Sequence, residues 1–151
     1  MLKSTLLALV VAGLTLAGAQ SGARAEAVWL TDYAKAKAQA AAEHKPMLLD
    51  FTGSDWCVWC IKFDKEVLST PEFEKYAAAN LVLVRLDFPE SKPQPAEEKK
   101  QNEALSDKFG VQGFPTLLLL SAAEKTLFVQ SGYAPGGPKA FLAKLAAAKK
   151  P

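Results

Sequence analysis

The chain contains only two cysteines, Cys57 and Cys60, and two residues separate them. This spacing lets two thiols close into a disulfide, or open again, with little movement of the backbone. A disulfide across so short a loop removes little chain entropy from the unfolded state, so it contributes little as a brace. The pair therefore predicts thiol–disulfide exchange, with a permanently oxidised, inert disulfide as the alternative.

The two thiols have different expected roles because the pair lies where a helix is predicted to begin. Cys57 comes first, where free backbone N–H groups favour a thiolate, and is the expected nucleophile. Cys60 lies one turn further and is the expected resolving thiol. Neither Val58 nor Trp59 between them carries a positive charge, so we expect a less extreme thiolate than a motif containing histidine would have.

The first 25 residues are typical of an export signal. Lys3 is followed by an uncharged apolar run from Leu6 to Ala19, and Ala23-Arg24-Ala25 has the pattern of a cleavage site. The run is too short to span a bilayer as a helix, although an uncleaved membrane anchor is the alternative. We predict a signal peptide over 1–25 and one domain over 26–151, since a mature chain of 126 residues suffices for one domain.

Cleavage also changes the charge of the protein. It removes two of the 18 basic residues and leaves 16, equal to the number of acidic residues. A net charge of zero does not favour nucleic acid or anionic lipid as a partner.

Hydrophobic periodicity, capping residues and turn residues divide the rest of the chain into helices and strands. Thr31 and Thr70 are the expected N-caps of two helices, the second with Pro71 at its first position. The segment Pro89–Pro95 holds three prolines and is expected to be a solvated loop. The expected helices cover 31–45, 57–68, 70–79, 96–109 and 139–148, and the expected strands are Met47–Thr52, Leu81–Phe88, Thr116–Leu120 and Thr126–Ser131.

This order predicts an α/β fold with a mixed sheet. The early strands connect through helices and should pair in parallel, whereas the last two are joined by a short turn and should form an antiparallel hairpin. Helices are expected on both faces of the sheet.

The order of elements, the CxxC pair after the first strong strand and Gly-x-Pro-Thr before the third together resemble the thioredoxin superfamily. The resemblance covers roughly residues 28–148, and the segment FTGSDWCVWC is especially similar to exported, single-domain thioredoxin-like proteins. It implies the thioredoxin fold, a central mixed sheet flanked by helices on both faces. Val58-Trp59 departs from the Gly-Pro and Pro-His pairs of better-known relatives, and this dipeptide helps to set the redox poise.

The resemblance also implies roles for residues outside the cysteine motif. Pro115 resembles the cis-proline of this fold, and the backbone of Phe114 would pair with an extended substrate segment. Trp56 would flank the site on the surface that faces the substrate. Asp50 would lie beneath the resolving cysteine and take its proton, with Arg85 as its basic partner.

Each of these residues also has a simpler interpretation. Asp50 and Arg85 could point to solvent from opposite strand faces. Pro115 could be an ordinary trans proline. Trp56 and Trp59 could be packing residues. The sole histidine, His44, lies at a helix end, where a capping or surface role is expected in place of metal ligation.

The sequence thus predicts an exported, periplasmic or secreted thiol–disulfide oxidoreductase that acts as a monomer without cofactor or metal. Reductase, oxidase and isomerase share such a site, and of these three the reductase direction is favoured. Its expected partners are cysteine-containing exported proteins and a membrane or periplasmic protein of the same redox relay. Two alternatives stay open: a thioredoxin-like binding module whose disulfide does not cycle, and a soft-metal (copper) carrier that uses Cys57 and Cys60 as thiolate ligands.

Overall fold

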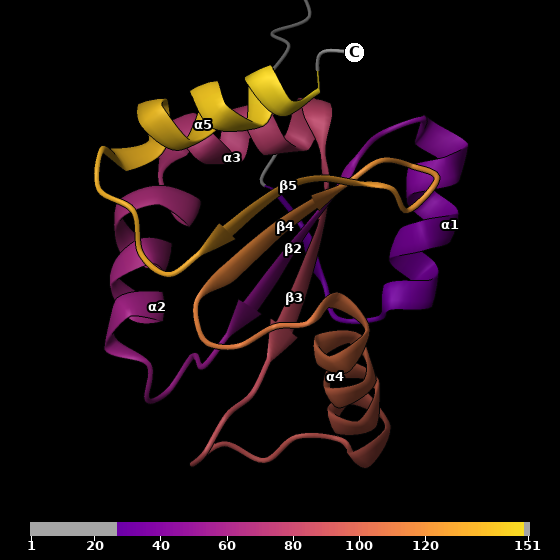
Figure 1. Cartoon of the computed structure of the whole chain (residues 1–151), viewed down its shortest axis with the longest axis vertical. Helices are drawn as coiled ribbons and strands as arrows, with labels where there is room; N and C mark the ends of the chain where they lie inside the picture. Colours follow the sequence, from indigo (N-terminus) through magenta and orange to yellow (C-terminus); the bar gives the residue numbers. More distant parts are fainter. Residues whose placement is uncertain (1–26, 150–151) are drawn as a thin grey trace, which may run out of the picture.

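The computed structural model describes residues 27–149. The predicted signal peptide lies outside these residues. A five-stranded sheet runs through the described part of the chain in the order β1-β3-β2-β4-β5 (Figure 1). Within residues 27–149, no helix is long and apolar enough to cross a membrane. The helices are α1 (Tyr33–Glu43), α2 (Val58–Phe63), α3 (Pro71–Asn80), α4 (Ala96–Phe109) and α5 (Gly137–Ala148), and the strands are β1 (Trp29–Leu30), β2 (Met47–Thr52), β3 (Val82–Asp87), β4 (Thr116–Leu120) and β5 (Thr126–Ser131).

The predicted mixed sheet is confirmed. Strands β2 and β3 pair in parallel, β4 pairs antiparallel with β2, and β5 pairs antiparallel with β4. Alternation along each strand sends successive side chains to opposite faces. On β2, for example, Leu49 and Phe51 belong to one core cluster and Leu48 to the other.

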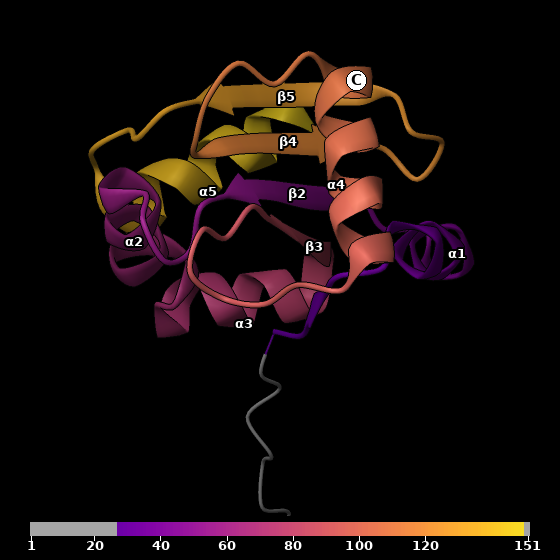
Figure 2. The same cartoon turned by 90° about the horizontal axis from the view of Figure 1, so that it is seen from below.

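Helices cover both faces of the sheet, as predicted (Figures 1 and 2). Residues of α1 and α4 close one core cluster, which includes Ala36, Ala40 and Leu105. Residues of α2, α3 and α5 close the other, which includes Phe63, Phe73 and Phe141. Asp50 and Arg85 are register partners on neighbouring strands, and by alternation they share the face that α2 covers.

Several boundaries differ from the expectations. The two-residue strand β1 was not predicted, because a strand this short carries no periodicity. Helix α1 has Asp32 and not Thr31 as its N-cap, since the Asp32 side chain accepts the Lys35 N–H. The predicted helix 57–68 changes after Phe63 into a π-helical segment, η1 (Asp64–Leu68). Helix α5 begins at Gly137, two residues before the predicted start.

Candidate active site

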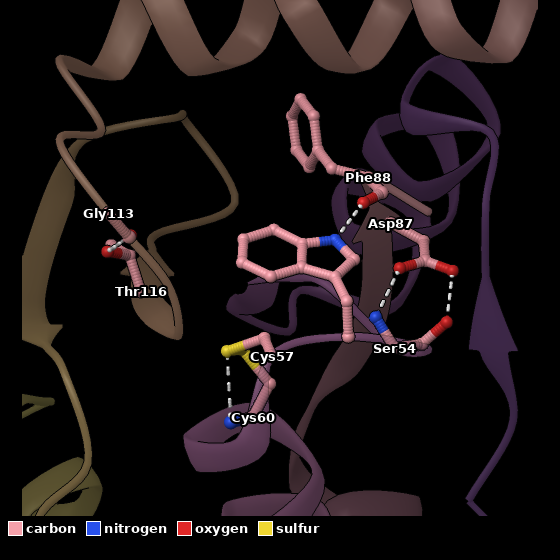
Figure 3. The surroundings of a disulfide bond; sticks show 8 residues. Ser54, Cys57, Cys60, Asp87, Phe88, Gly113 and Thr116 are labelled. Carbon is pink, nitrogen blue, oxygen red and sulfur yellow. Dashed lines mark hydrogen bonds between the residues drawn. A yellow bond between two sulfur atoms is a disulfide. The ribbon is translucent and has the colours of Figure 1, made fainter. Parts of the chain in front are cut away.

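The cysteine pair lies where β2 gives way to α2. Cys57 and Cys60 form a disulfide with an S–S distance of 2.09 Å and a Cα–Cα distance of 5.2 Å. Cys57 is the N-cap of α2, and its Sγ accepts the backbone N–H of Cys60 at 3.2 Å (Figure 3). A helix N-terminus that directs an N–H group at sulfur favours the thiolate over the thiol.

An apolar surface surrounds this disulfide. Cys57 itself exposes 6% of its surface and Cys60 3%. Large apolar side chains next to them are much more exposed: Trp56 at 41%, Val58 at 72% and Trp59 at 55%. Both tryptophans are therefore partly exposed and are not core residues, although each packs against another aromatic ring. Exposed apolar side chains gathered around a reactive group are typical of a surface that binds another protein.

Asp50 lies on β2, on the face covered by α2, and its side chain is only 4% exposed. Arg85 on β3 places its Nε 3.5 Å from Asp50 Oδ2. The alternative that both side chains point to solvent from opposite faces is therefore wrong. Burial raises the pKa of Asp50 to about 7, more than the nearby Arg85 cation lowers it. This carboxyl group can therefore hold or release a proton near neutral pH.

Asp64 is a third charged residue of this group, and the sequence reasoning missed it. Its Oδ1 accepts a hydrogen bond from Arg85 Nη2 at 2.7 Å. Asp64 follows Cys60 by four residues, so helical spacing was the available signal for it. Nothing local distinguishes it from the other acids of this helix.

Two loops at the carboxyl ends of β2 and β3 are joined by hydrogen bonds. The Asp87 carboxylate accepts both the backbone N–H and the hydroxyl of Ser54, at 2.9 and 2.6 Å (Figure 3). The Asp55 carboxylate accepts the backbone N–H groups of residues 90, 91 and 92. The 89–95 loop is solvated, as expected. It is also hydrogen-bonded to Asp55 in the loop that precedes Cys57. These contacts span more than 30 residues, and the sequence reasoning missed them.

Trp56 is held by contacts on three sides. Its Nε1–H donates to the Phe88 carbonyl oxygen at 2.8 Å (Figure 3). Its indole lies so close over Gly53 that a Cβ atom there would be 2.5 Å from the ring. Its ring also meets that of Phe114 edge to face, with 6.0 Å between the centroids. Trp56 is therefore partly exposed and yet fixed in place beside Cys57.

The Phe114–Pro115 peptide bond is cis, so the alternative of a trans proline is wrong. Phe114, Trp59 and Tyr133 line an open cavity of about 320 Å³. The Tyr133 ring packs against Trp59, with 5.4 Å between the centroids, and the Lys62 Nζ lies over both rings. Tyr133 and Lys62 were not among the site residues expected from the sequence. The cavity lies between the helix that carries the cysteines and the loop of the cis peptide.

The remaining predictions concern metal and His44. His44 ends α1 with a left-handed backbone, φ 53°, and its backbone N–H donates to the Ala40 carbonyl. Among residues 27–149, no group of three or more histidine, cysteine and acidic side chains is placed to hold a metal ion.

Comparison with known proteins shows similarity to thioredoxin-like proteins. Residues 28–122 match the family model described as thioredoxin-like. Disulfide bond reductase DsbH of Chlamydia pneumoniae is 41% identical over 118 residues, which cover 78% of this chain and 70% of that protein. Thioredoxin-related protein DsbJ of the same organism is 35% identical over 114 residues, 76% of this chain but only 33% of DsbJ.

A solved structure described as DsbH oxidoreductase superposes with a TM-score of 0.78 at 37% identity, and covers 91% of this chain and 94% of that one. The predicted thioredoxin fold is thereby confirmed. Taken with the cysteine pair at the start of α2, these similarities show that the chain belongs to the thioredoxin-like family and is a protein thiol–disulfide oxidoreductase.

Proposed function

We propose that this protein is an exported reductase of protein disulfides. The observation that carries the proposal is the sulfur of Cys57 at a helix start, accepting the Cys60 N–H and surrounded by exposed apolar side chains. The similarity to a protein named a disulfide bond reductase supports the direction of electron flow.

In the first step, the Cys57 thiolate attacks one sulfur of a substrate disulfide. A bond forms between Cys57 and that sulfur, the substrate S–S bond breaks, and the other substrate sulfur leaves as a thiolate that takes a proton from water. The Cys60 N–H that Cys57 Sγ accepts in the disulfide supports this thiolate in the reduced protein.

In the second step, the Cys60 thiol gives its proton to Asp50 and attacks Cys57. The Cys57–Cys60 disulfide forms, the mixed disulfide breaks, and the second substrate thiolate leaves and is protonated. Two electrons pass from this protein to the substrate. A carboxyl group with a pKa of about 7 is suited to accept a proton at neutral pH and to pass it on to water.

The substrate binds over the apolar surface beside Cys57. The side chains of Trp56 and Phe114 flank the binding surface on one side of Cys57. The backbone at Phe114 and Pro115 pairs with an extended substrate segment. Val58 and Trp59 face the partner from α2, where both are exposed. Such a surface suits a cysteine-containing polypeptide better than a small disulfide.

The partners that we propose are cysteine-containing exported proteins as substrates and a thiol–disulfide relay protein that reduces the Cys57–Cys60 disulfide again. We further propose that residues 1–25 are a signal peptide and that the monomeric domain 26–151 acts in the periplasm or outside the cell. The apolar run and the Ala23-Arg24-Ala25 site support this location.

Reduction of insulin by dithiothreitol in the presence of the protein tests the activity. We expect the wild-type protein to accelerate the reaction and Cys57→Ser to abolish the acceleration. Cys60→Ser should accumulate a mixed disulfide through Cys57, which mass spectrometry would detect. A wild-type protein that reacts with an alkylating agent after mild reduction, and yet does not accelerate insulin reduction, would instead be a binding module.

The reduction potential against glutathione tests the direction. A value near about −270 mV is expected of a reductase, whereas a value near about −120 mV would identify an oxidant and refute the proposed direction. Export is tested separately by sequencing the N-terminus of the protein from cell fractions. Glu26 as the first residue of a periplasmic form is the expected result, and an intact Met1 in the membrane fraction would contradict it.

A further inference from the structure

The Arg85 guanidinium lies between the carboxylates of Asp50 and Asp64 and forms a hydrogen bond with only one of them. Its Nη2 donates to Asp64 Oδ1 at 2.7 Å. Its Nε is 3.5 Å from Asp50 Oδ2 but is a buried nitrogen without a hydrogen-bond partner among the described residues. Arg85 is therefore hydrogen-bonded to the outer carboxylate, Asp64, and only close to the inner one, Asp50.

The position of the guanidinium is fixed from other sides as well. The strand register places Arg85 opposite Asp50. The indole of Trp29 on β1 lies against the guanidinium, with 4.4 Å from Cζ to the ring centroid. The Asp64 carboxylate is in turn held by the Ser69 hydroxyl, which donates to its Oδ2 at 2.8 Å. The arrangement is thus built by four elements, β1, β2, β3 and η1.

This ion pair opens onto the resolving cysteine. Cys60, Asp64 and Arg85 line one cavity of about 200 Å³, together with Lys65 and Ser54. Asp64 lies toward solvent, with a side chain 38% exposed, whereas that of Asp50 is 4% exposed. A change at Asp64 therefore acts on the guanidinium from the solvent side without entering the core.

We propose that Asp64 is a positioning residue for the resolving step: by holding Arg85 in its own hydrogen bond, it leaves Asp50 free to take the Cys60 proton. The inference rests on the proposed role of Asp50. Were Arg85 to turn fully onto Asp50, a charge-assisted hydrogen bond would stabilise the ionised carboxylate and make it a weaker base.

The charged and titratable groups around Asp50 are consistent with this role. Burial raises its pKa and Arg85 lowers it, while Asp64 and Asp87 raise it further. Cys60 of α2 and Lys65 of η1 line the cavity that Arg85 and Asp64 also line. The contribution of Asp64 therefore has two routes, its own charge and its hold on Arg85, and the experiment must separate them.

Titration of the Asp50 side-chain carboxyl carbon by NMR, in the oxidised full-length protein, follows its pKa directly. We expect Asp64→Ala to lower the pKa of Asp50 by about 1 pH unit, because a freed guanidinium can hydrogen-bond to it. The pH midpoint of the resolving step, measured in a single turnover with a mixed disulfide on Cys57, should fall by the same amount. Asp107→Asn, which changes an exposed carboxylate on α4, is the matched control and should move neither value.

Arg85→Met separates the two routes. It should raise the pKa of Asp50, and adding Asp64→Ala to it should then have little further effect, as a double-mutant cycle measures. An equal fall of the pKa with and without Arg85 would overturn the positioning role, because Asp64 would then act only by its charge. If Asp64→Ala does not fold, Asp64→Asn retains an acceptor without the charge and should shift the pKa in the same direction by less.

Failure of the inference and failure of the proposed function are distinguishable. The NMR titration needs no catalytic activity, so an unchanged Asp50 titration in Asp64→Ala would overturn only the positioning by Asp64. A wild-type protein without reductase activity would overturn the proposed function and, with it, any role in a resolving step.

Discussion

Two carboxylates at opposite ends of the sheet, those of Asp50 and Glu124, lie in contrasting environments. Asp50 lies in the second half of β2, the strand that leads into the cysteine loop. Glu124 lies in the turn after β4, whose last residue, Leu120, pairs with Met47 at the other end of β2. Glu124 accepts the Tyr33 hydroxyl at 2.7 Å and contacts Lys37 and Lys108 at 2.6 and 3.3 Å.

The two environments move the pKa in opposite directions. Hydrogen bonds from Lys37 and Tyr33 lower the pKa of Glu124 to about 2, whereas burial raises that of Asp50 to about 7. Glu124 has several donors and partial exposure, so it is ionised at neutral pH and links α1 and α4 to the β4–β5 turn. Asp50 has one cation nearby and no solvent, so its charge changes near neutral pH. The comparison shows that burial brings the pKa of one carboxyl group close to neutral pH, whereas hydrogen bonds from several donors keep the other ionised.

The largest expected effect is on the pH dependence of stability. Because the pKa of Asp50 in the folded protein lies above its unfolded value of 3.8, the folded state binds an extra proton between about pH 4 and 7. The free energy of unfolding should therefore fall as the pH rises from about 4 to about 7, by up to about 4 kcal/mol. Urea unfolding of the oxidised protein from pH 4 to 8 should show this fall in the wild type and a flatter profile in Asp50→Asn; parallel profiles would contradict the raised pKa.

The next effect is on the resolving step. Asp50→Asn removes the proposed proton acceptor and should slow this step by about 100-fold at pH 7. Rapid quenching of a single turnover should then show the mixed disulfide on Cys57 accumulating. Glu124→Gln, the same chemical change at the other end of the sheet, is the control and should leave the rate unchanged. Equal rates in Asp50→Asn and wild type would remove Asp50 from the mechanism.

Glu124 should matter for stability alone. Glu124→Gln loses its contacts with two lysines, at a cost of about 1–2 kcal/mol at pH 7. Because the folded pKa of Glu124 is below its unfolded value of 4.5, this contribution is present above about pH 4.5 and is lost as the pH falls toward 2. Thermal or urea unfolding at pH 7 and pH 3 would measure it, and a loss of the same size at both would argue against the lowered pKa.

The smallest expected effect is at the tryptophan beside Cys57. Gly53→Ala would bring a Cβ atom within 2.5 Å of the Trp56 ring, so the indole must shift from its hydrogen bond to Phe88. We expect kcat/KM for insulin to fall about 5-fold, the equivalent of about 1 kcal/mol of binding. The rate with a small disulfide such as oxidised glutathione should hold, and an equal loss with both substrates would place Trp56 outside substrate binding.

Much of the fold could be predicted from local patterns. Alternation and capping residues predicted strands β2 to β5 and helices α3 and α4 closely. An element that is buried on one face has apolar residues at regular intervals, and this periodicity is visible in the sequence. Asp50 and Arg85 were paired through the resemblance to the thioredoxin superfamily, because alternation alone left open that both point to solvent. Strand β1 did not stand out, since two residues carry no period and owe their conformation to pairing with β3.

By itself, the sequence determined the central chemistry: two thiols at redox spacing before a helix, and a mixed sheet to carry them. The structure was needed to show that Asp50 is buried and that Arg85 lies beside it. Only the tertiary structure decided which acids act as what. Asp64, Asp55 and Glu124 are ordinary charged residues in the sequence, and their roles come from partners 21 to 91 positions away. Local propensity reflects the preference of a residue for a helix, strand or turn. A pKa shift or a hydrogen bond between loops depends instead on groups that only folding brings together.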